Sequence, residues 1–334
     1  MTTFEALWVD EEQVAANVSL AEAIDIVERG LETESRGEAV AMEKTHAAWP
    51  DGSLHALGAV SITAGFAATK TWAHTGQGST PLLVLFDRES GALRAVIEAF
   101  ALGQLRTAAI SAVATRWLAP KDASELALIG SGKQALAQVA AVAHVRRLRR
   151  VRVFSPNPAH RRSFAESLRA ELSREVVEAS SVAAAVEGAG IVTLATRATE
   201  PFLTADLLAP GAHVNAIGAI TPERAELGQD VLSRARRVVV DSWPAARRFS
   251  REMIDFYGAA DEAWKGVETL ASVVGAKRAR EAETDLTLFK AMGTGMADLA
   301  LAIDVYYRVR RAGGGRELPQ PERVRPRLLP GGRD

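Results

Sequence analysis

The sequence predicts an α/β protein that combines a Rossmann-type, doubly wound parallel sheet with an α+β domain built on an antiparallel sheet. Two changes in pattern along the chain predict this fold. From Glu125 onward, short apolar runs alternate with helical segments, which is typical of parallel strands covered by helices on both faces. Before that point, residues 40–100 hold short alternating runs bounded by turn residues, which is typical of antiparallel strands.

The first region opens with a helix over residues 20–31, where apolar residues recur at helical spacing and Ser19 can cap the N-terminus. The antiparallel strands follow, and a second helix is expected over residues 101–118. Turn-forming residues at 50–52 and 88–91 separate the strands, and residues 82–86 and 93–97 are expected to pair as a hairpin.

The second region repeats strand and helix. Strands are expected at 125–129, 151–154, 191–195, 212–217 and 238–240, and helices at 134–148 and 158–172. Residues 287–309 are expected to form one long helix that bends near Gly293 and Gly295. The tail at 313–334 is rich in Gly, Pro and Arg, so we expect it to be disordered.

The composition narrows the class of function. The formal net charge is −1 and aromatic residues make up 6% of the chain, so we expect neither a nucleic-acid partner nor a membrane partner. The chain has no Cys, and its 6 His residues show no metal-ligand spacing, so we expect no metal. We see no secretory signal and no apolar stretch of the ~18 residues that a membrane helix needs, so we expect a cytoplasmic protein.

The segment Gly130-Ser131-Gly132-Lys133-Gln134-Ala135 lies between an expected strand and an expected helix. In this context Gly130 permits the tight turn, Gly132 lets the backbone approach a pyrophosphate, and Ala135 permits close packing of helix on sheet. We therefore expect a dinucleotide site that includes Lys133 and Gln134. The alternative is a glycine-rich turn without a ligand.

The end of the second strand decides which dinucleotide is expected. An NAD enzyme usually places Asp or Glu there, whereas this chain has Ser155 and Asn157, with Arg161 and Arg162 close behind. Hydroxyl, amide and guanidinium groups accept a 2′-phosphate that a carboxylate would repel. We expect NADP(H) in preference to NAD(H). The alternative is that both arginines only solvate a helix face.

Three cations lie in segments of the first region that otherwise read as structural: Lys44, Lys70 and Arg106. An unpaired ammonium is costly to bury, so Lys70 in an apolar strand is notable. If the three converge, they form a carboxylate-binding pocket in which a lysine can also move protons. The alternative is that they are surface cations. His46 and His74 lie nearby and rank second as acid–base groups.

Several segments together resemble the ornithine cyclodeaminase/mu-crystallin family, over roughly residues 19–307. They are Lys70 with its flanks, residues 105–112 (Leu-Arg-Thr-Ala-Ala-Ile-Ser-Ala), the loop at 129–135, residues 199–201 (Thr-Glu-Pro), residues 211–219 (Gly-Ala-His-Val-Asn-Ala-Ile-Gly-Ala), residues 240–242 (Val-Asp-Ser) and residues 289–293 (Phe-Lys-Ala-Met-Gly).

The resemblance implies a homodimer formed through the antiparallel domain, an active site between the domains and redox chemistry on the C–N bond of amino or imino acids. It implies that Lys70 is the catalytic lysine and that Arg106 binds the substrate carboxylate. Thr107 matches a residue near the cofactor phosphates. Thr196, Gly218 and Gly293 match positions that line the nicotinamide side.

The expected division of the chain follows from both arguments. Residues 1–118, with about 296–312, are expected to form the substrate-binding and dimerisation domain, and residues 119–295 the NAD(P)-binding Rossmann domain. The boundary is expected at Ala119-Pro120-Lys121-Asp122.

Two departures from the family pattern bear on the substrate. The family usually has Arg at the position of Lys44, and a lysine keeps the charge but loses the planar fork. Ornithine cyclodeaminases carry an Asp at the position of Ile220, where it handles the distal amine of the substrate. Isoleucine cannot accept a hydrogen bond, so cyclodeamination of ornithine is disfavoured and an apolar substrate side chain is indicated.

Three hypotheses follow. The first is an NAD(P)H-dependent reductase of cyclic or open-chain imines, most of all 2-imino acids. The second is an amino-acid dehydrogenase of the alanine dehydrogenase type, which dependence on free ammonium would reveal. The third is an NADPH-loaded protein that binds small ligands without turnover, for which Lys70→Ala would leave the behaviour unchanged.

Overall fold

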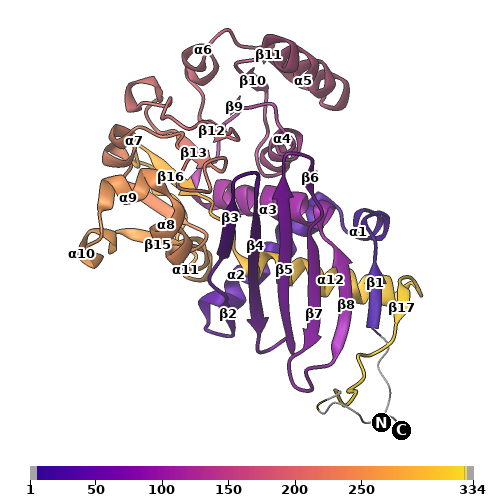
Figure 1. Cartoon of the computed structure of the whole chain (residues 1–334). Coiled ribbons are helices and arrows are strands. Elements are labelled where there is room, and N and C mark those ends of the chain that lie inside the picture. Colours follow the sequence, from indigo (N-terminus) through magenta and orange to yellow (C-terminus); the bar gives the residue numbers. More distant parts are fainter. Residues whose placement is uncertain (1–5, 327, 329–334) are drawn as a thin grey trace.

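The structure is a computed structural model that describes residues 6–326 and 328, and it contains two sheets (Figure 1). In the described residues, the first sheet has nine strands in the order β17-β1-β8-β7-β5-β4-β2, with β3 on β4 and β6 on β5. Its strands are β1 (Ala6–Val9), β2 (Ala39–Ala41), β3 (Thr45–Trp49), β4 (Gly52–Ser61), β5 (Phe66–Thr75), β6 (Gly78–Ser79), β7 (Leu82–Asp87), β8 (Leu93–Glu98) and β17 (Arg316–Leu318). All pairs are antiparallel except β1 with β8.

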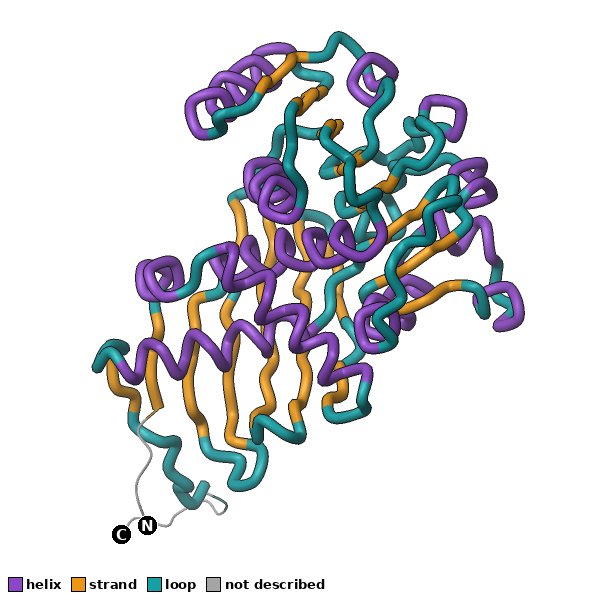
Figure 2. The backbone as a smooth tube through the Cα atoms, turned by 180° about the vertical axis from the view of Figure 1, so that it is seen from behind, coloured by secondary structure: helices purple, strands orange, loops and turns teal. Residues whose placement is uncertain are grey.

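Helices cover one face of this sheet and leave the other face without a helix (Figure 2). They are α1 (Glu11–Asn17), α2 (Leu20–Ser35), α3 (Phe100–Leu118) and α12 (Gly295–Arg311). Ser19 is the N-cap of helix α2 and forms a capping box with Glu22, which confirms the N-cap prediction. Leu83 and Leu85 of β7 and Ile97 of β8 are buried beneath the helices, so alternation along the strands builds the core on that face.

The second sheet is parallel throughout its eight described strands, in the order β11-β10-β9-β12-β13-β16-β14-β15. Its first five positions have the order 3-2-1-4-5 of a dinucleotide-binding sheet. The strands are β9 (Glu125–Ile129), β10 (Arg150–Phe154), β11 (Glu175–Glu178), β12 (Ile191–Leu194), β13 (His213–Ala216), β14 (Arg237–Val240), β15 (Val267–Thr269) and β16 (Thr287–Lys290).

Separate apolar clusters pack against this sheet, which explains why the central strands β9 and β12 are buried along nearly their whole length. The helical segments between its strands are α4 (Ala135–Val145), α5 (Pro158–Glu171), α6 (Val182–Val186), η1 (Ala205–Leu207), α7 (Gln229–Arg234), α8 (Trp243–Phe249), α9 (Arg251–Tyr257), α10 (Asp261–Trp264) and α11 (Leu270–Gly275). The predicted fold class, a doubly wound parallel sheet beside an antiparallel one, is confirmed.

The prediction of one bent helix over residues 287–309 is wrong for its first part. Thr287–Lys290 form strand β16, which is fully buried between β13 and β14. Gly293, at φ +94°, and the N-cap Thr294 then turn the chain into α12. A short apolar run does not distinguish a buried strand from a helix by its spacing alone, and the following helix extended the pattern.

The prediction of a disordered tail is wrong for part of the tail. Arg316–Leu318 form β17, which pairs antiparallel with β1. Composition alone missed this strand because its order comes from an edge that β1 offers at the other end of the chain. Residues 327 and 329–334 of that prediction lie outside the described residues.

Candidate active site

The three predicted cations converge on one pocket of about 270 Å³ between the two sheets. Lys44 comes from the loop before β3, Lys70 from β5 and Arg106 from the first turns of α3. Segments of the second sheet complete the lining, among them Ile220 after β13 and Gly293 after β16. Surface cations, the alternative, are excluded for Lys44 and Lys70, which are 6% and 4% exposed.

A buried carboxylate organises two of these cations. Asp298, in the first turn of α12, is 1% exposed. Its Oδ1 lies 2.5 Å from Lys70 Nζ and 3.3 Å from Arg106 Nε. Its Oδ2 has no hydrogen-bond partner among the described residues. Asp298 therefore neutralises one charge and leaves an excess of positive charge in the pocket, which favours an anionic ligand.

Lys44 is held by neutral groups. Its Nζ donates to the carbonyl oxygens of Ile220 and Met292, each at 3.4 Å, and lies 5.4 Å from the centre of the Phe249 ring. Met292 and Gly293 are fixed in turn, because their N–H groups donate to Asp241 at 2.7 and 2.8 Å. The Lys44 ammonium is thus anchored to the loops after β13 and β16 and is not paired with a carboxylate there.

Burial lowers the pKa of both lysines in the pocket. It lowers the pKa of Lys70 to about 8, and the nearby positive charge of Arg106 acts in the same direction against Asp298. Burial likewise lowers the pKa of Lys44 to about 8, with Arg106 again adding to the effect. A lysine with a pKa near neutrality can exchange a proton during a reaction.

Aromatic rings border the cations on the side of the first sheet. Trp72 lines the pocket, and its ring centre lies 5.4 Å from Lys70 Nζ. His55 stacks on Trp72 at 4.9 Å, and His46 stacks on His55 at 5.5 Å. Burial lowers the pKa of His55 to about 4, so this ring is neutral at pH 7 and supports Trp72 as a flat apolar wall. His46 is not among the pocket-lining residues.

The predicted dinucleotide loop has the backbone that such a site needs. Gly130 has φ +115°, and a Cβ there would collide with the carbonyl of Ala195. A Cβ on Gly132 would meet no atom within 4 Å, so the loop surface is open at that point. Ala135 opens helix α4 and is fully buried in the apolar cluster beneath it. N–H groups of the first turn of α4 can donate hydrogen bonds to a phosphate.

A hollow of about 620 Å³ extends from this loop over the ends of β9 and β10. Ser155 lines it, whereas Asn157 and Arg161 do not. Asn157 caps α5 by accepting from the N–H of His160. Arg161 pairs with Glu178 at 3.0 Å and donates to the Ser155 carbonyl. The structure thus gives two of the residues predicted to bind the 2′-phosphate local partners of their own.

A third hollow, of about 840 Å³, lies over the ends of β12 and β13 and adjoins the cationic pocket. Thr196 and Gly218 line it, together with Lys133 and Gln134 of the glycine loop. His74 also lines it, and its Nε2 lies 3.4 Å from Arg197 Nη2. Thr107 lines the cationic pocket, and its hydroxyl donates to the Gly103 carbonyl at 2.7 Å.

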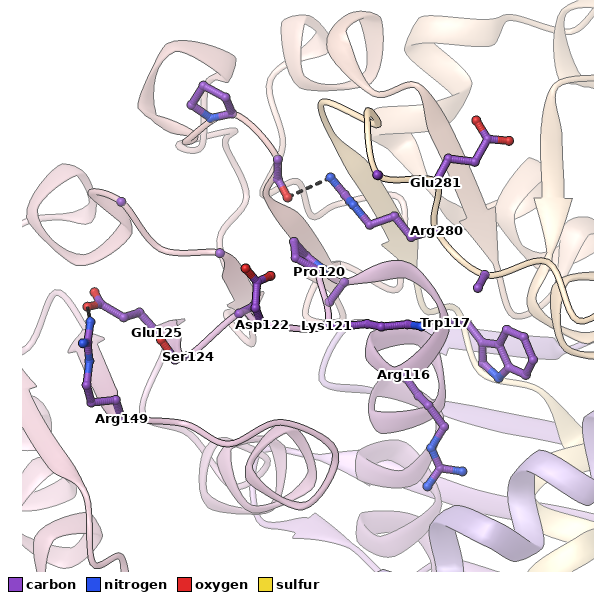
Figure 3. A pocket seen from close by; sticks show the side chains of 18 residues that line it. Arg116, Trp117, Pro120, Lys121, Asp122, Ser124, Glu125, Arg149, Arg280 and Glu281 are labelled. Carbon is purple, nitrogen blue, oxygen red and sulfur yellow. Dashed lines mark hydrogen bonds and ion pairs between the residues drawn. The ribbon is translucent and has the colours of Figure 1, made fainter.

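A separate hollow of about 760 Å³ lies at the amino ends of the parallel strands (Figure 3). Three of its charged side chains have partners within the fold: Arg149 pairs with Glu125 at 3.0 Å, and Arg280 donates to the carbonyls of Gly211 and Leu118. Ligands of open parallel sheets bind at the carboxyl ends of the strands, so we assign the functional site to the other edge.

Sequence analysis missed the acidic residues of the site. Asp298 and the buried Glu226 were not singled out, and Asp241 was noted only within the segment 240–242 and given no role, because a lone Asp or Glu in a helix or loop gives no local signal. Their importance comes from burial and from partners that are distant in the sequence. The described part of the chain holds no group of three His, Cys, Asp or Glu side chains suited to a metal ion, and no helix there is long and apolar enough to cross a membrane.

A dinucleotide-type parallel sheet facing a cationic, lysine-containing pocket defines the class, a nicotinamide-dependent oxidoreductase. The chain belongs to the ornithine cyclodeaminase/mu-crystallin family, whose sequence profile matches residues 5–313.

Named relatives and solved structures show which proteins this chain is similar to within the family. Ketimine reductase mu-crystallin of Rattus norvegicus is 33% identical over 228 residues, which cover 67% of this chain and 68% of the relative. The structure of Thermococcus litoralis Delta(1)-pyrroline-2-carboxylate reductase with NADH and L-proline superposes with a TM-score of 0.87 at 28% identity, covering 93% of this chain and 100% of that one. An archaeal alanine dehydrogenase dimer with bound NAD also gives 0.87, at 25% identity, covering 94% and 99%.

Proposed function

We propose that this protein reduces the C=N bond of a small 2-imino acid, cyclic or open-chain, with a nicotinamide cofactor. The observation that carries the proposal is the pairing of Lys70 with Asp298 beside Arg106, in a pocket that adjoins the hollow over β12 and β13. The pocket volume of about 270 Å³ suits a small substrate, and Ile220 and Trp72 suit an apolar side chain.

Each side chain has a task in this reaction. Arg106 and Lys44 hold the substrate carboxylate, Arg106 through its planar fork. Asp298 fixes the Lys70 ammonium, and Lys70 gives a proton to the imine nitrogen, which becomes the amine nitrogen, and is reprotonated from solvent. The glycine loop and the α4 N-terminus fit a pyrophosphate, and the cofactor, when bound, supplies the hydride that the imine carbon receives.

The assay follows NADPH or NADH oxidation with pyrroline-2-carboxylate and piperideine-2-carboxylate, and then with keto acids plus amines. We expect turnover with at least one imino acid and none with ornithine in the oxidative direction, because Ile220 cannot accept a hydrogen bond from a distal amine. Absence of turnover with every imino acid would overturn the proposal.

Alanine dehydrogenase activity is the second candidate. The similarity to an archaeal alanine dehydrogenase over 94% of this chain favours it. It uses the same hydride step but requires free ammonium, so an absolute dependence of pyruvate reduction on ammonium would support this candidate over the imine reductase.

The cofactor preference is proposed to be NADP(H) over NAD(H). Ser155 stands at the end of β10 where an NAD enzyme has a carboxylate, and Arg161 neutralises the neighbouring Glu178. We expect Ser155→Asp to raise the dissociation constant of NADPH relative to that of NADH by about tenfold or more, because a carboxylate repels the 2′-phosphate. Ser155→Asn is the uncharged control, and an equal response of both variants would contradict the preference.

A homodimer is also proposed, formed by residues 1–118 with 296–312. The face of the first sheet without helices exposes Val40, Met42, Leu54 and Ile62, each at 47% or more, and the archaeal relative is a dimer. The same face of a second copy of the chain would bury these exposed apolar side chains in a symmetric interface. Light scattering of Leu54→Asp is expected to show monomers where the wild-type chain shows dimers, and an unchanged mass would contradict this face.

A further inference from the structure

Glu226 is a buried carboxylate that lies between two loops at the carboxyl ends of neighbouring parallel strands. It is 0% exposed. Its Oε1 accepts from the N–H and the hydroxyl of Thr196, at 2.8 and 2.7 Å, in the loop after β12. Its Oε2 accepts from the N–H groups of Gly218 and Ala219, at 3.0 and 3.1 Å, in the loop after β13. Hydrogen bonds to a charged acceptor are the strong ones, so this carboxylate fixes the two loops to each other.

The two loops approach so closely that only glycine fits at position 218. A Cβ there would collide with Glu226 Oε1 and with the backbone nitrogen and oxygen of Thr196. The carboxylate therefore occupies the space that a side chain at 218 would fill. Its position is set by the backbone on both sides, and it leaves little room for either loop to shift alone.

A second buried carboxylate supports the first. Glu252, in α9, accepts from the N–H groups of Glu226 and Leu227 at 2.6 and 3.0 Å through its Oε1. Its Oε2 lies 2.5 Å from the ammonium of Lys290, at the end of β16, and both side chains are at most 1% exposed. The network thus connects the ends of β12, β13 and β16, which are consecutive strands in the parallel sheet.

These strand ends stand where the second half of a dinucleotide belongs. In a sheet of order 3-2-1-4-5, the first nucleotide lies over the first three strands in sequence and the second over the fourth and fifth, here β12 and β13. Thr196 and Gly218 line the hollow at that place, and Ile217 and Ile220 are shared between this hollow and the cationic pocket. The loops that Glu226 joins therefore face the position of the reacting ring.

We propose that Glu226 is a positioning residue for the nicotinamide half of the cofactor. It acts through Thr196 and Gly218, whose backbone it holds in one arrangement. Both residues line the hollow over β12 and β13, whereas only Thr196 also borders the hollow over β9 and β10, so the larger effect is expected on the nicotinamide half. The proposal rests on the proposed function in that it takes a nicotinamide dinucleotide as the ligand of this cleft.

The experiment compares two ligands that share the adenosine half. NADPH spans both halves of the site, whereas adenosine 2′,5′-bisphosphate lacks the nicotinamide. For Glu226→Gln, one oxygen becomes an NH₂ group that faces N–H donors, so one loop loses its acceptor. We expect the dissociation constant of NADPH, measured by calorimetry, to rise about tenfold or more, while that of the bisphosphate changes less than about twofold.

Glu268→Gln is the matched control. Glu268 lies on β15, at the far edge of the same sheet, and pairs with Arg237 and Arg278. Gly218→Ala is the second variant, because it keeps the carboxylate and displaces the loop by sterics, and it serves also if Glu226→Gln does not fold. It is expected to give the same selective loss of NADPH binding.

Two results would overturn the proposal: equal weakening of both ligands, which means a general structural role, or no change for either ligand. The measurement is independent of turnover. A wild-type protein that binds NADPH but reduces no imine would refute the proposed reaction and leave this test intact, whereas a wild-type protein that binds no dinucleotide would refute both.

Discussion

The wall of the cleft that belongs to the first sheet presents a cluster of buried charged side chains, whereas the wall that belongs to the parallel sheet presents the glycine-containing loops at the ends of its strands. On the first wall, Lys70 and Arg106 converge on Asp298 from β5, α3 and α12. On the second wall, Gly130 and Gly218 line the two hollows, and the buried carboxylate of Glu226 holds the loops after β12 and β13 together. The first wall suits proton transfer and carboxylate binding, and the second suits a phosphate and a flat ring.

This difference teaches which property each wall controls. A side chain that touches the substrate changes the rate of the chemical step when it is replaced, because its charge acts at the reacting atoms. A group that shapes backbone changes ligand affinity, because it alters the geometry that the ligand meets. The following predictions test whether the two walls are separable in this way, from the largest effect to the smallest.

Replacing Lys70 is expected to have the largest effect. Lys70→Met keeps the aliphatic stem and removes the proton donor, so kcat/KM for imine reduction should fall by about 10³-fold. The dissociation constant of NADPH should stay within about twofold, because the lysine belongs to the other wall. Stopped-flow and calorimetry measure the two quantities. A parallel loss of cofactor binding would break the separation of the walls.

The pH dependence of the rate is the second test. The pKa of Lys70 is about 8, and a lysine carries its proton below its pKa, so kcat/KM should be level below pH 8 and fall about tenfold per pH unit above it. Lys44 has a pKa near the same value, so the profile alone does not separate the two.

Lys44→Arg resolves this ambiguity, because arginine keeps its charge at every pH of the assay. If Lys70 is the donor, the fall above pH 8 persists in this variant. If the fall disappears, Lys44 is the titrating group, and Lys70 serves as an anchor for the carboxylate.

The smallest effect concerns Glu34, on α2, whose carboxyl group interacts electrostatically with that of Asp241, just after β14. Burial, with a contribution from Asp241, raises the pKa of Glu34 to about 7 from 4.5. The folded state therefore binds a proton that the unfolded state has released. Its stabilising contribution is complete below pH 4.5 and is lost as the pH rises through 7.

Glu34→Gln carries no charge at any pH, so its stability relative to wild type should increase as the pH rises from 5 to 8. Urea titration at the two pH values should show that the free energy of unfolding of the variant, minus that of wild type, increases by on the order of 2 kcal/mol. Glu32→Gln, on the same helix, is the control. A constant difference between wild type and Glu34→Gln across that range would contradict the buried, protonated state of Glu34.

Local patterns predicted strands β9, β10, β12, β13 and β14 of the parallel sheet, because each strand–turn–helix unit is encoded within a few tens of residues. The short edge strands β11 and β15 were not predicted. The glycine loop was found in this way, since its geometry depends on small residues at fixed spacing. Strand β16 and strand β17 were missed for the opposite reason. Each exists because of partners far along the chain, β13 and β14 for β16 and β1 for β17.

The sequence by itself determined the two kinds of sheet, the dinucleotide loop and the identity of the three cations. The tertiary structure alone decided that Lys44, Lys70 and Arg106 share one pocket, that Asp298 is the counter-ion of Lys70 and Arg106, and that Arg161 already has a partner in Glu178. The physical reason is the distance along the chain over which each interaction acts. Turns and strand patterns follow from neighbouring residues, whereas charge pairing and desolvation depend on which distant segments the fold brings within a few ångströms.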